Sequence, residues 1–263
     1  MQAITIFAGD PPPGPLTPFA QSLHERWQAA PADRRAEDGE ALRLLGAQAT
    51  HWPYADAVYR RHPITGVALY DSEESIFGGV AEADASAIES LRDRLKRIDP
   101  SARLIVPLTA GHHVDHQIVR AAAESVRRSL IYYEDYPYAE TPEKLRAALQ
   151  SGAWESELVL LADEAIRAKA AAILAYRSQM STFFKSASEM GQRVHAYAGL
   201  VGGQAGPAER LWRAIARRGS QTPDLLAAEE HTRCRLPKSP RLRARLKTRR
   251  TGIPMPAVDP RLA

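Results

Sequence analysis

Short apolar runs alternate with amphipathic stretches along most of this 263-residue chain. The runs are as long as buried strands, and the stretches between them repeat apolar residues every three or four positions, as helices do. We expect strands over residues 4–8, 49–53, 103–106, 130–133 and 158–161, and helices over 32–45, 83–97, 113–128, 164–179 and 207–217, with another opening at Pro142 behind an N-cap at Thr141. This alternation predicts an α/β fold with a Rossmann-like, mostly parallel sheet flanked by helices.

Two further features of the sequence concern the end of a predicted helix and a long connection. Gly46 follows the last periodic residue of the 32–45 segment, which is typical of a residue just beyond a helix C-terminus. Residues 54–79 have no period and are rich in polar and aromatic residues. Because so long a connection is unusual inside a compact domain, we expect this segment to be functional or poorly ordered.

Charge divides the chain into two parts. Residues 231–263 hold ten of the 35 lysines and arginines and one of the 31 acids, so this tail carries +9 and the remaining 230 residues carry −5. The tail lacks a periodic apolar face, and we expect a domain over 1–230 followed by a disordered basic tail. We do not expect nucleic acid as a partner, because the body is acidic and the tail has no aromatic residue to stack on bases.

Several classes of protein are excluded by composition. No apolar run approaches the roughly 20 residues that span a bilayer, and the N-terminus lacks the basic region of a signal peptide. Cys234 is the only cysteine, so neither an internal disulfide nor a cage of thiolates around a metal can form. These features favour a cytoplasmic protein, and they say nothing of its oligomeric state.

Three of the eight histidines lie within residues 112–116, together with Asp115, between the strand over 103–106 and the helix after it. Open α/β sheets place their chemistry at such junctions, and grouped imidazoles indicate a metal or acid/base site. His113 and His116 are three apart, so they share one face of a helix, and the helix N-terminus favours neutral imidazoles. The alternative to a functional site is that these histidines are simply polar residues in the first turn of a helix. A catalytic zinc would need a third ligand, expected after another strand.

The segment over 111–120, Gly-His-His-Val-Asp-His-Gln-Ile-Val-Arg, resembles the second motif of the PIG-L/LmbE-like deacetylases, in their bacterial branch. These zinc hydrolases remove acetyl groups from N-acetylglucosamine-type sugars and related amides. Other blocks agree in order along the chain, over residues 5–9, 34–46, 54–60, 132–138, 169–179 and 209–212. The resemblance therefore implies a zinc-dependent deacetylase whose partner is a small N-acetylated sugar or amide.

The resemblance also implies roles for single residues. His116 would be a zinc ligand, and His113 would steady the oxyanion or protonate the leaving amine. Asp115 would be a supporting carboxylate that orients an imidazole. Arg34 and Asp56 would face the substrate, with Arg35 as the alternative to Arg34. Taken without the family pattern, Arg34 and Asp56 are surface charges on a helix and a loop.

The first motif of the family is absent. Its members begin with a strand that ends in His-Pro-Asp-Asp, which supplies two zinc ligands and the general base, and the chain contains no such motif. We therefore expect the fold to lack its first strand and the ligand set to be incomplete, as in a truncated version of a longer gene. Asp10 is the only acid at an equivalent strand end, and we do not expect it to bind the metal.

Two other functions stay open. A non-catalytic relative could bind a sugar or a protein partner without metal. A nucleotide-sugar enzyme has weaker support, since only the stretch over 202–206, Gly-Gly-Gln-Ala-Gly, resembles a dinucleotide motif, and it lies far too late in the chain. Four tyrosines over 132–138 either line a sugar pocket or alternate in burial along a strand.

Overall fold

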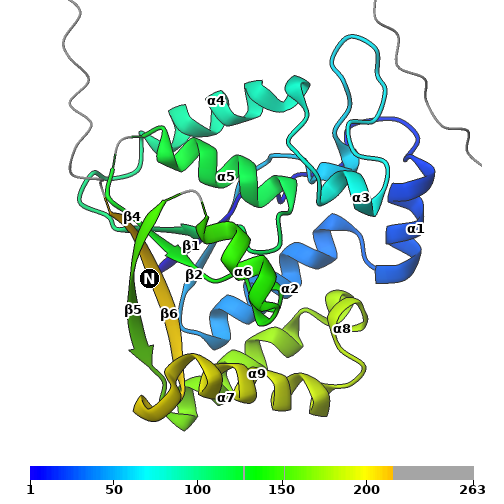
Figure 1. Cartoon of the computed structure of the whole chain (residues 1–263). Helices are drawn as coiled ribbons and strands as arrows, with labels where there is room; N and C mark the ends of the chain where they lie inside the picture. The colour runs from blue at the N-terminus through cyan, green and yellow to red at the C-terminus, as the bar shows by residue number, and fades with distance from the viewer. Residues whose placement is uncertain (127, 151, 216–263) are drawn as a thin grey trace, which may run out of the picture. The chain divides into compact units, whose positions relative to one another are not determined.

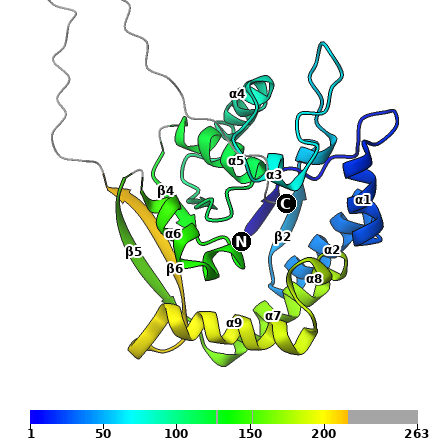
Figure 2. The ribbon, with the colours of Figure 1, turned by 45° about the vertical axis from the view of Figure 1, so that its right-hand side comes forward.

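The structure, a computed structural model, describes residues 1–126, 128–150 and 152–215, so the predicted tail and Cys234 lie outside the described residues. The strands of this part form two sheets. In the first, β1 (Gln2–Thr5) pairs in parallel with β2 (Gln48–His51). In the second, β3 (Leu104–Pro107) and β4 (Leu130–Tyr133) are parallel, and β6 (Ala208–Ile215) and β5 (Ala153–Leu160) extend the sheet in antiparallel fashion. Figure 2 shows β1 and β2 apart from the long ribbon of β5 and β6.

Helices surround both sheets, and Figure 1 shows α4 and α5 side by side. Besides single 3₁₀ turns, the described helices are α1 (Pro18–Trp27), α2 (Pro31–Leu44), α3 (Glu73–Ile76), α4 (Ala85–Leu95), α5 (Val114–Glu124), α6 (Pro142–Leu149), α7 (Asp163–Ala175), α8 (Arg177–Phe183) and α9 (Ala187–Gly202). The predicted α/β class, with parallel strand pairs flanked by helices, is confirmed, and the strands as a whole are mixed, because β6 is antiparallel to both β4 and β5. The antiparallel pairs belong to the last two strands.

One apolar core joins the two sheets. Trp52 beside β2 and Val106 in β3 are buried in the same cluster as Leu91 of α4 and Ile118 of α5, and Ile4 of β1 packs against it. α4 and α5 supply the stripe predicted from their spacing. Two sheets that share one core are held together by burial of apolar surface rather than by strand pairing. The expectation that one strand of the sheet is absent stays a prediction.

Near the C-terminal end of the described part, one predicted helix is wrong. Residues 207–217 were expected to be helical, but 208–215 form β6. This strand pairs with β4 on one side, where Trp212 lies opposite Tyr132, and along its whole length with β5 on the other. Hydrogen bonding on both edges outweighs local helix propensity, which is a weak determinant of structure. Helices α1, α3 and α9 were not anticipated.

The predicted helix over 164–179 is broken into α7 and α8 at Tyr176, whose ψ is 63°. The break has a physical cause in α2. Tyr176 donates its hydroxyl to Asp38 at 2.5 Å, and the Ser178 backbone N–H and hydroxyl both donate to Glu37. Two buried carboxylates of α2 thus bind groups that a continuous helix would direct elsewhere. Gly46 has a φ of 64° just after α2, as predicted.

Candidate functional site

The loop between β3 and α5 holds its histidines in a constrained backbone. Thr109 and His112 have φ values of 66° and 59°, in the left-handed region that side chains disfavour. Gly111 lies so close to Tyr138 that a Cβ at this position would be 2.5 Å from the ring. Backbone strain of this kind is found preferentially at functional sites. Helix α5 begins directly after this loop, with His113 as its N-cap.

His113 accepts a hydrogen bond on Nδ1 from the backbone N–H of Asp115, at 3.2 Å. Burial lowers the pKa of His113 to about 4, and the neighbouring His116 adds to the decrease. The imidazole is therefore neutral at physiological pH, as expected at a helix N-terminus. The ring of Phe77 packs edge-on against it, with 5.4 Å between ring centroids.

His116 lies one helical turn further along α5, with its ring centroid 5.8 Å from that of His113. Its Nδ1 is 2.5 Å from Oδ1 of Asp135, a carboxylate that is 2% exposed just beyond β4. The other oxygen, Oδ2, accepts the backbone N–H of Ala110 at 2.9 Å. Asp135 was not singled out from the sequence. The general expectation of an acid after another strand would have led to it, because β3 and β4 are parallel and end together.

The side chain of Asp115 pairs with Arg60 and lies near the backbone of Ala57. Its Oδ1 lies 2.6 Å from Nη1 of Arg60, and its Oδ2 lies 3.4 Å from the backbone N–H of Ala57. Arg60 also binds Asp84 through Nε at 2.8 Å, so one guanidinium bridges two buried carboxylates. Burial raises the pKa of Asp115, the nearby Asp56 raises it further, and Arg60 opposes both. Among the hydrogen bonds of the described residues, Asp115 binds His113 through its backbone N–H, which donates to Nδ1 of the imidazole. Its predicted role in orienting an imidazole is untested.

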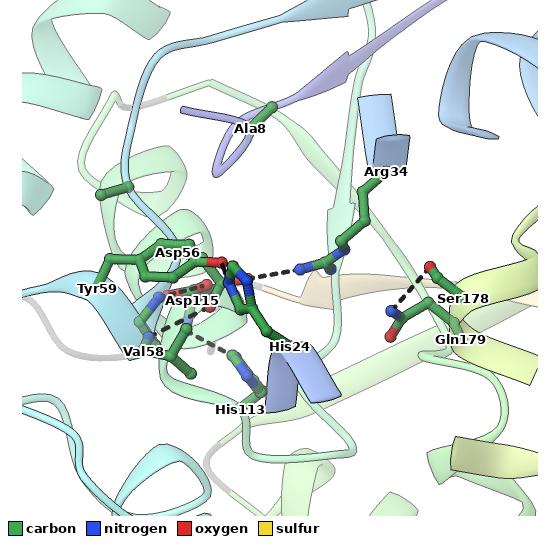
Figure 3. Close-up of polar contacts among 12 residues, drawn as sticks. Ala8, His24, Arg34, Asp56, Val58, Tyr59, His113, Asp115, Ser178 and Gln179 are labelled. Atoms are coloured by element: carbon green, nitrogen blue, oxygen red, sulfur yellow. Dashed lines mark hydrogen bonds and ion pairs between the residues drawn. The ribbon is translucent and has the colours of Figure 1, made fainter. Parts of the chain in front are cut away.

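Arg34 and Asp56 come together, as Figure 3 shows. Nη1 of Arg34 is 3.1 Å from Oδ2 of Asp56, and the two side chains are 34% and 15% exposed. Asp56 and Arg34 both influence the pKa of His113, which indicates that the three charged or titratable groups share one site. Arg35 turns elsewhere, donating to the Ala8 carbonyl and pairing with Asp10. The structure therefore separates the two arginines that the sequence left as alternatives, although a substrate contact by Arg34 stays a prediction.

Helix α1 adds residues that sequence reasoning missed. His24 Nε2 and the Tyr59 hydroxyl are 2.6 Å apart, and the guanidinium of Arg34 lies over the ring of Trp27 at 4.9 Å. Burial raises the pKa of Tyr59 to about 12, with Asp56 contributing. In Figure 3, His24 and Tyr59 lie beside Asp56, while Ser178 and Gln179 approach from α8. Phe19, Leu23 and Trp27 are spaced by four residues behind Thr17 and Pro18, so a helix signal for α1 was present in the sequence but was not used.

The predicted zinc site is incomplete within residues 1–126, 128–150 and 152–215, because these contain no group of three His, Cys, Asp or Glu residues placed to hold a metal ion. His116 has a nitrogen available, but Asp10 is ion-paired with Arg35 and 70% exposed at its side chain. The residues described therefore do not fit a complete zinc site.

The tyrosines over 132–138 lie in different surroundings. Tyr132 is 3% exposed and Tyr133 is 38% exposed, but Leu130 and Ile131 are buried as well, so burial does not alternate along β4. Tyr138 instead packs against Phe77, at 5.8 Å between centroids, and Phe77 contacts His113. Tyr138 thus borders the site. The glycines over 202–206 end α9 and lead into β6, which is the reverse of the strand-to-helix order that a dinucleotide motif requires.

Two histidines that follow one strand of the α/β fold, together with the Arg34–Asp56 pair, make up the candidate site. The chain is similar in structure to teicoplanin deacetylase Orf2 in a zinc-inhibited form, with a TM-score of 0.69 and 24% identity over 83% of this chain and 88% of that one. It is also similar to a deacetylase–teicoplanin complex (TM-score 0.66, 23% identity, 81% and 86% covered) and to the A40926 pseudoaglycone deacetylase Dbv21 (0.62, 24%, 84% and 87%). At these identities the likeness establishes the fold.

No protein-family model matches the sequence, and no curated protein matches it significantly. None of the helices in the described ranges is both long and apolar enough to cross a membrane.

Proposed function

We propose that this chain is a member of the PIG-L/LmbE-like deacetylase family whose site binds an N-acetylated sugar or a related amide, and that the chain by itself releases little acetate. The observation that carries the proposal is the position of His113 near the Arg34–Asp56 pair, with His116 one helical turn further along α5. The structural likeness to deacetylases supports it. The chemistry suits a substrate with hydroxyl groups and one amide, because a guanidinium and a carboxylate recognise hydroxyls while an imidazole contacts the amide carbonyl.

The residues of this chain would perform three tasks. Arg34 and Asp56 would bind and orient the sugar. His113 is neutral, and its Nδ1 already accepts a hydrogen bond, so its proton is on Nε2. This N–H would stabilise the oxygen that gains negative charge when water adds to the amide carbon, as donors in oxyanion holes do. Asp115, bound to Arg60, would fix the first turn of α5 and with it both histidines.

Zinc is the metal of this proposal, and a neighbouring structure is described as a zinc-inhibited deacetylase. A bound zinc ion would polarise the carbonyl and activate water. His116 is the one predicted ligand among the described residues, and a catalytic site needs three. We therefore expect the 263-residue chain to bind zinc weakly and to hydrolyse amides poorly by itself.

The incomplete set of metal ligands in the described part of the chain favours a second function, which is sugar binding without metal or catalysis. The site keeps the groups that would contact a sugar, whereas three metal ligands do not come together in the described part of the chain. We propose a cytoplasmic location, in keeping with a single cysteine. The basic tail is assigned no partner.

Zinc content and acetate release test the proposed function in one preparation. The purified chain is dialysed, analysed for zinc, and incubated with N-acetylglucosamine, with and without chelator. We expect substoichiometric zinc, little acetate, and sugar binding that persists in chelator. Stoichiometric zinc and acetate release, both lost in His116→Ala, would show a full deacetylase and contradict the incomplete ligand set. Absence of any sugar binding would refute the proposed function.

A further inference from the structure

In each of the two site histidines, one ring nitrogen is hydrogen-bonded to a neighbouring group. One of these neighbours is a hydrogen-bond donor and the other is an acceptor. At His113 the fixed atom is Nδ1, which accepts the backbone N–H of Asp115. At His116 the fixed atom is again Nδ1, but its partner is the carboxylate oxygen Oδ1 of Asp135. A backbone N–H can only donate and an ionised carboxylate can only accept. Nδ1 therefore carries a lone pair in His113 and a proton in His116.

We propose that Asp135 is a positioning residue that holds His116 in the tautomer with a free lone pair on Nε2, opposite to the tautomer of His113. The inference rests on the proposed function for its purpose, but not for its geometry. The two rings are 5.8 Å apart between centroids. They offer one N–H donor and one lone pair to the same site. The donor suits a carbonyl oxygen that gains negative charge, and the lone pair suits a cation or a proton taken from water.

Asp135 is itself fixed. Its carboxylate is 2% exposed, and Oδ2 accepts the N–H of Ala110 at 2.9 Å, so the group cannot rotate without breaking a buried hydrogen bond. Ala110 belongs to the loop that carries the histidines, between Thr109 and Gly111. One carboxylate thus connects the end of β4 to both the loop and α5. Acidic partners of this kind set the tautomer and orientation of histidines in many metal sites.

This arrangement makes Asp135→Asn a sharp test. In the variant, the amide oxygen must face the Ala110 N–H, because an amide NH₂ there would oppose another donor. The NH₂ group then faces Nδ1 of His116. That nitrogen must accept, and the ring proton moves to Nε2. A side chain of nearly the same size therefore reverses the tautomer of His116 without emptying the space.

The tautomers are read from imidazole ¹⁵N chemical shifts in histidine-labelled protein, free of metal and sugar, above the pKa of the rings. His113→Gln and His116→Gln serve only to assign signals. We expect a pyrrole-type Nδ1 and a pyridine-type Nε2 for His116, and the reverse for His113. In Asp135→Asn the two shifts of His116 should exchange while those of His113 stay. Asp38→Asn is the matched control, since Asp38 contacts His51 at 2.7 Å, and it should leave His116 unchanged.

A wild-type His116 with its proton on Nε2 overturns the proposal, and this spectrum decides even if the variant does not fold. Unchanged His116 shifts in Asp135→Asn overturn it too, as does an exchange in Asp38→Asn. Because neither substrate nor zinc is present, these outcomes are independent of the sugar-binding assay. A protein with the expected tautomers that binds no sugar would refute the proposed function alone.

Discussion

Replacing Arg60 with methionine is expected to lower the free energy of unfolding by about 3–5 kcal/mol, the usual effect of removing one partner from a buried ion pair. Arg60 is 10% exposed and bridges Asp84 and Asp115, whose side chains are 6% and 9% exposed. Without the guanidinium, two carboxylates stay in a low-dielectric interior and must be protonated or hydrated. Methionine retains most of the apolar stem, so the loss reports on charge rather than on an empty space.

Chemical denaturation measures this effect, and Arg26→Met is its matched control. Arg26 pairs with Glu73 at 2.8 Å, but the two side chains are 46% and 58% exposed. An exposed pair contributes only about 0–1 kcal/mol. Adding Asp115→Asn to Arg60→Met should recover part of the lost stability, because it removes one of the unpaired charges. A loss in Arg60→Met no greater than that in Arg26→Met would contradict the buried bridge.

Replacing Glu37 with alanine is expected to cost about 3 kcal/mol, because two hydrogen bonds to a buried carboxylate are lost and their donors are left unpaired. Glu37 is 5% exposed and accepts the Ser178 N–H at 3.0 Å and the Ser178 hydroxyl at 2.6 Å. These bonds tie α2 to the first turn of α8. Since α2 also carries Arg34, the variant should loosen the side of the site that is proposed to bind sugar.

The control for this prediction lies on the same helix. Glu40 of α2 is bound to Arg43 at the surface, so Glu40→Ala should change stability far less than Glu37→Ala does. Glu37→Gln keeps one acceptor oxygen and should retain part of the stability. Equal unfolding midpoints for Glu37→Ala and Glu40→Ala would show that the link between α2 and α8 is not formed.

The elements that the sequence predicted well are those whose signals are local. His113 begins α5 because an acceptor side chain, a buried valine and an acid follow the pattern of a helix start. Gly46 ends α2 because glycine readily adopts the positive φ that is common just beyond a helix C-terminus. In contrast, β6 is a strand because β4 and β5 pair with it, and Tyr176 breaks a helix because Asp38 binds its hydroxyl. Partners distant in sequence decide such cases, and no window along the chain contains them.

The site shows the same division. His113, His116, Arg34 and Asp56 were proposed from motif order, and the structure places Arg34 against Asp56 and the two histidines one turn apart. Asp135, Arg60 and His24 were missed. Each of these three contacts its site partner from 19 or more positions away along the chain. For Asp135, its place after a strand parallel to β3 was an available signal that composition alone did not reveal.

The central claim is that the site containing Arg34, Asp56 and His113 binds an N-acetylated sugar. Calorimetric titration with N-acetylglucosamine in chelator tests it most directly, using wild type, Arg34→Ala and, as the matched control on the same helix, Arg35→Ala. Loss of a charged hydrogen bond of about 1.5–3 kcal/mol weakens binding by roughly tenfold or more. We predict saturable binding that Arg34→Ala weakens by at least about tenfold and Arg35→Ala leaves unchanged. Equal binding by all three proteins, or a larger effect of Arg35→Ala, would contradict the proposed site.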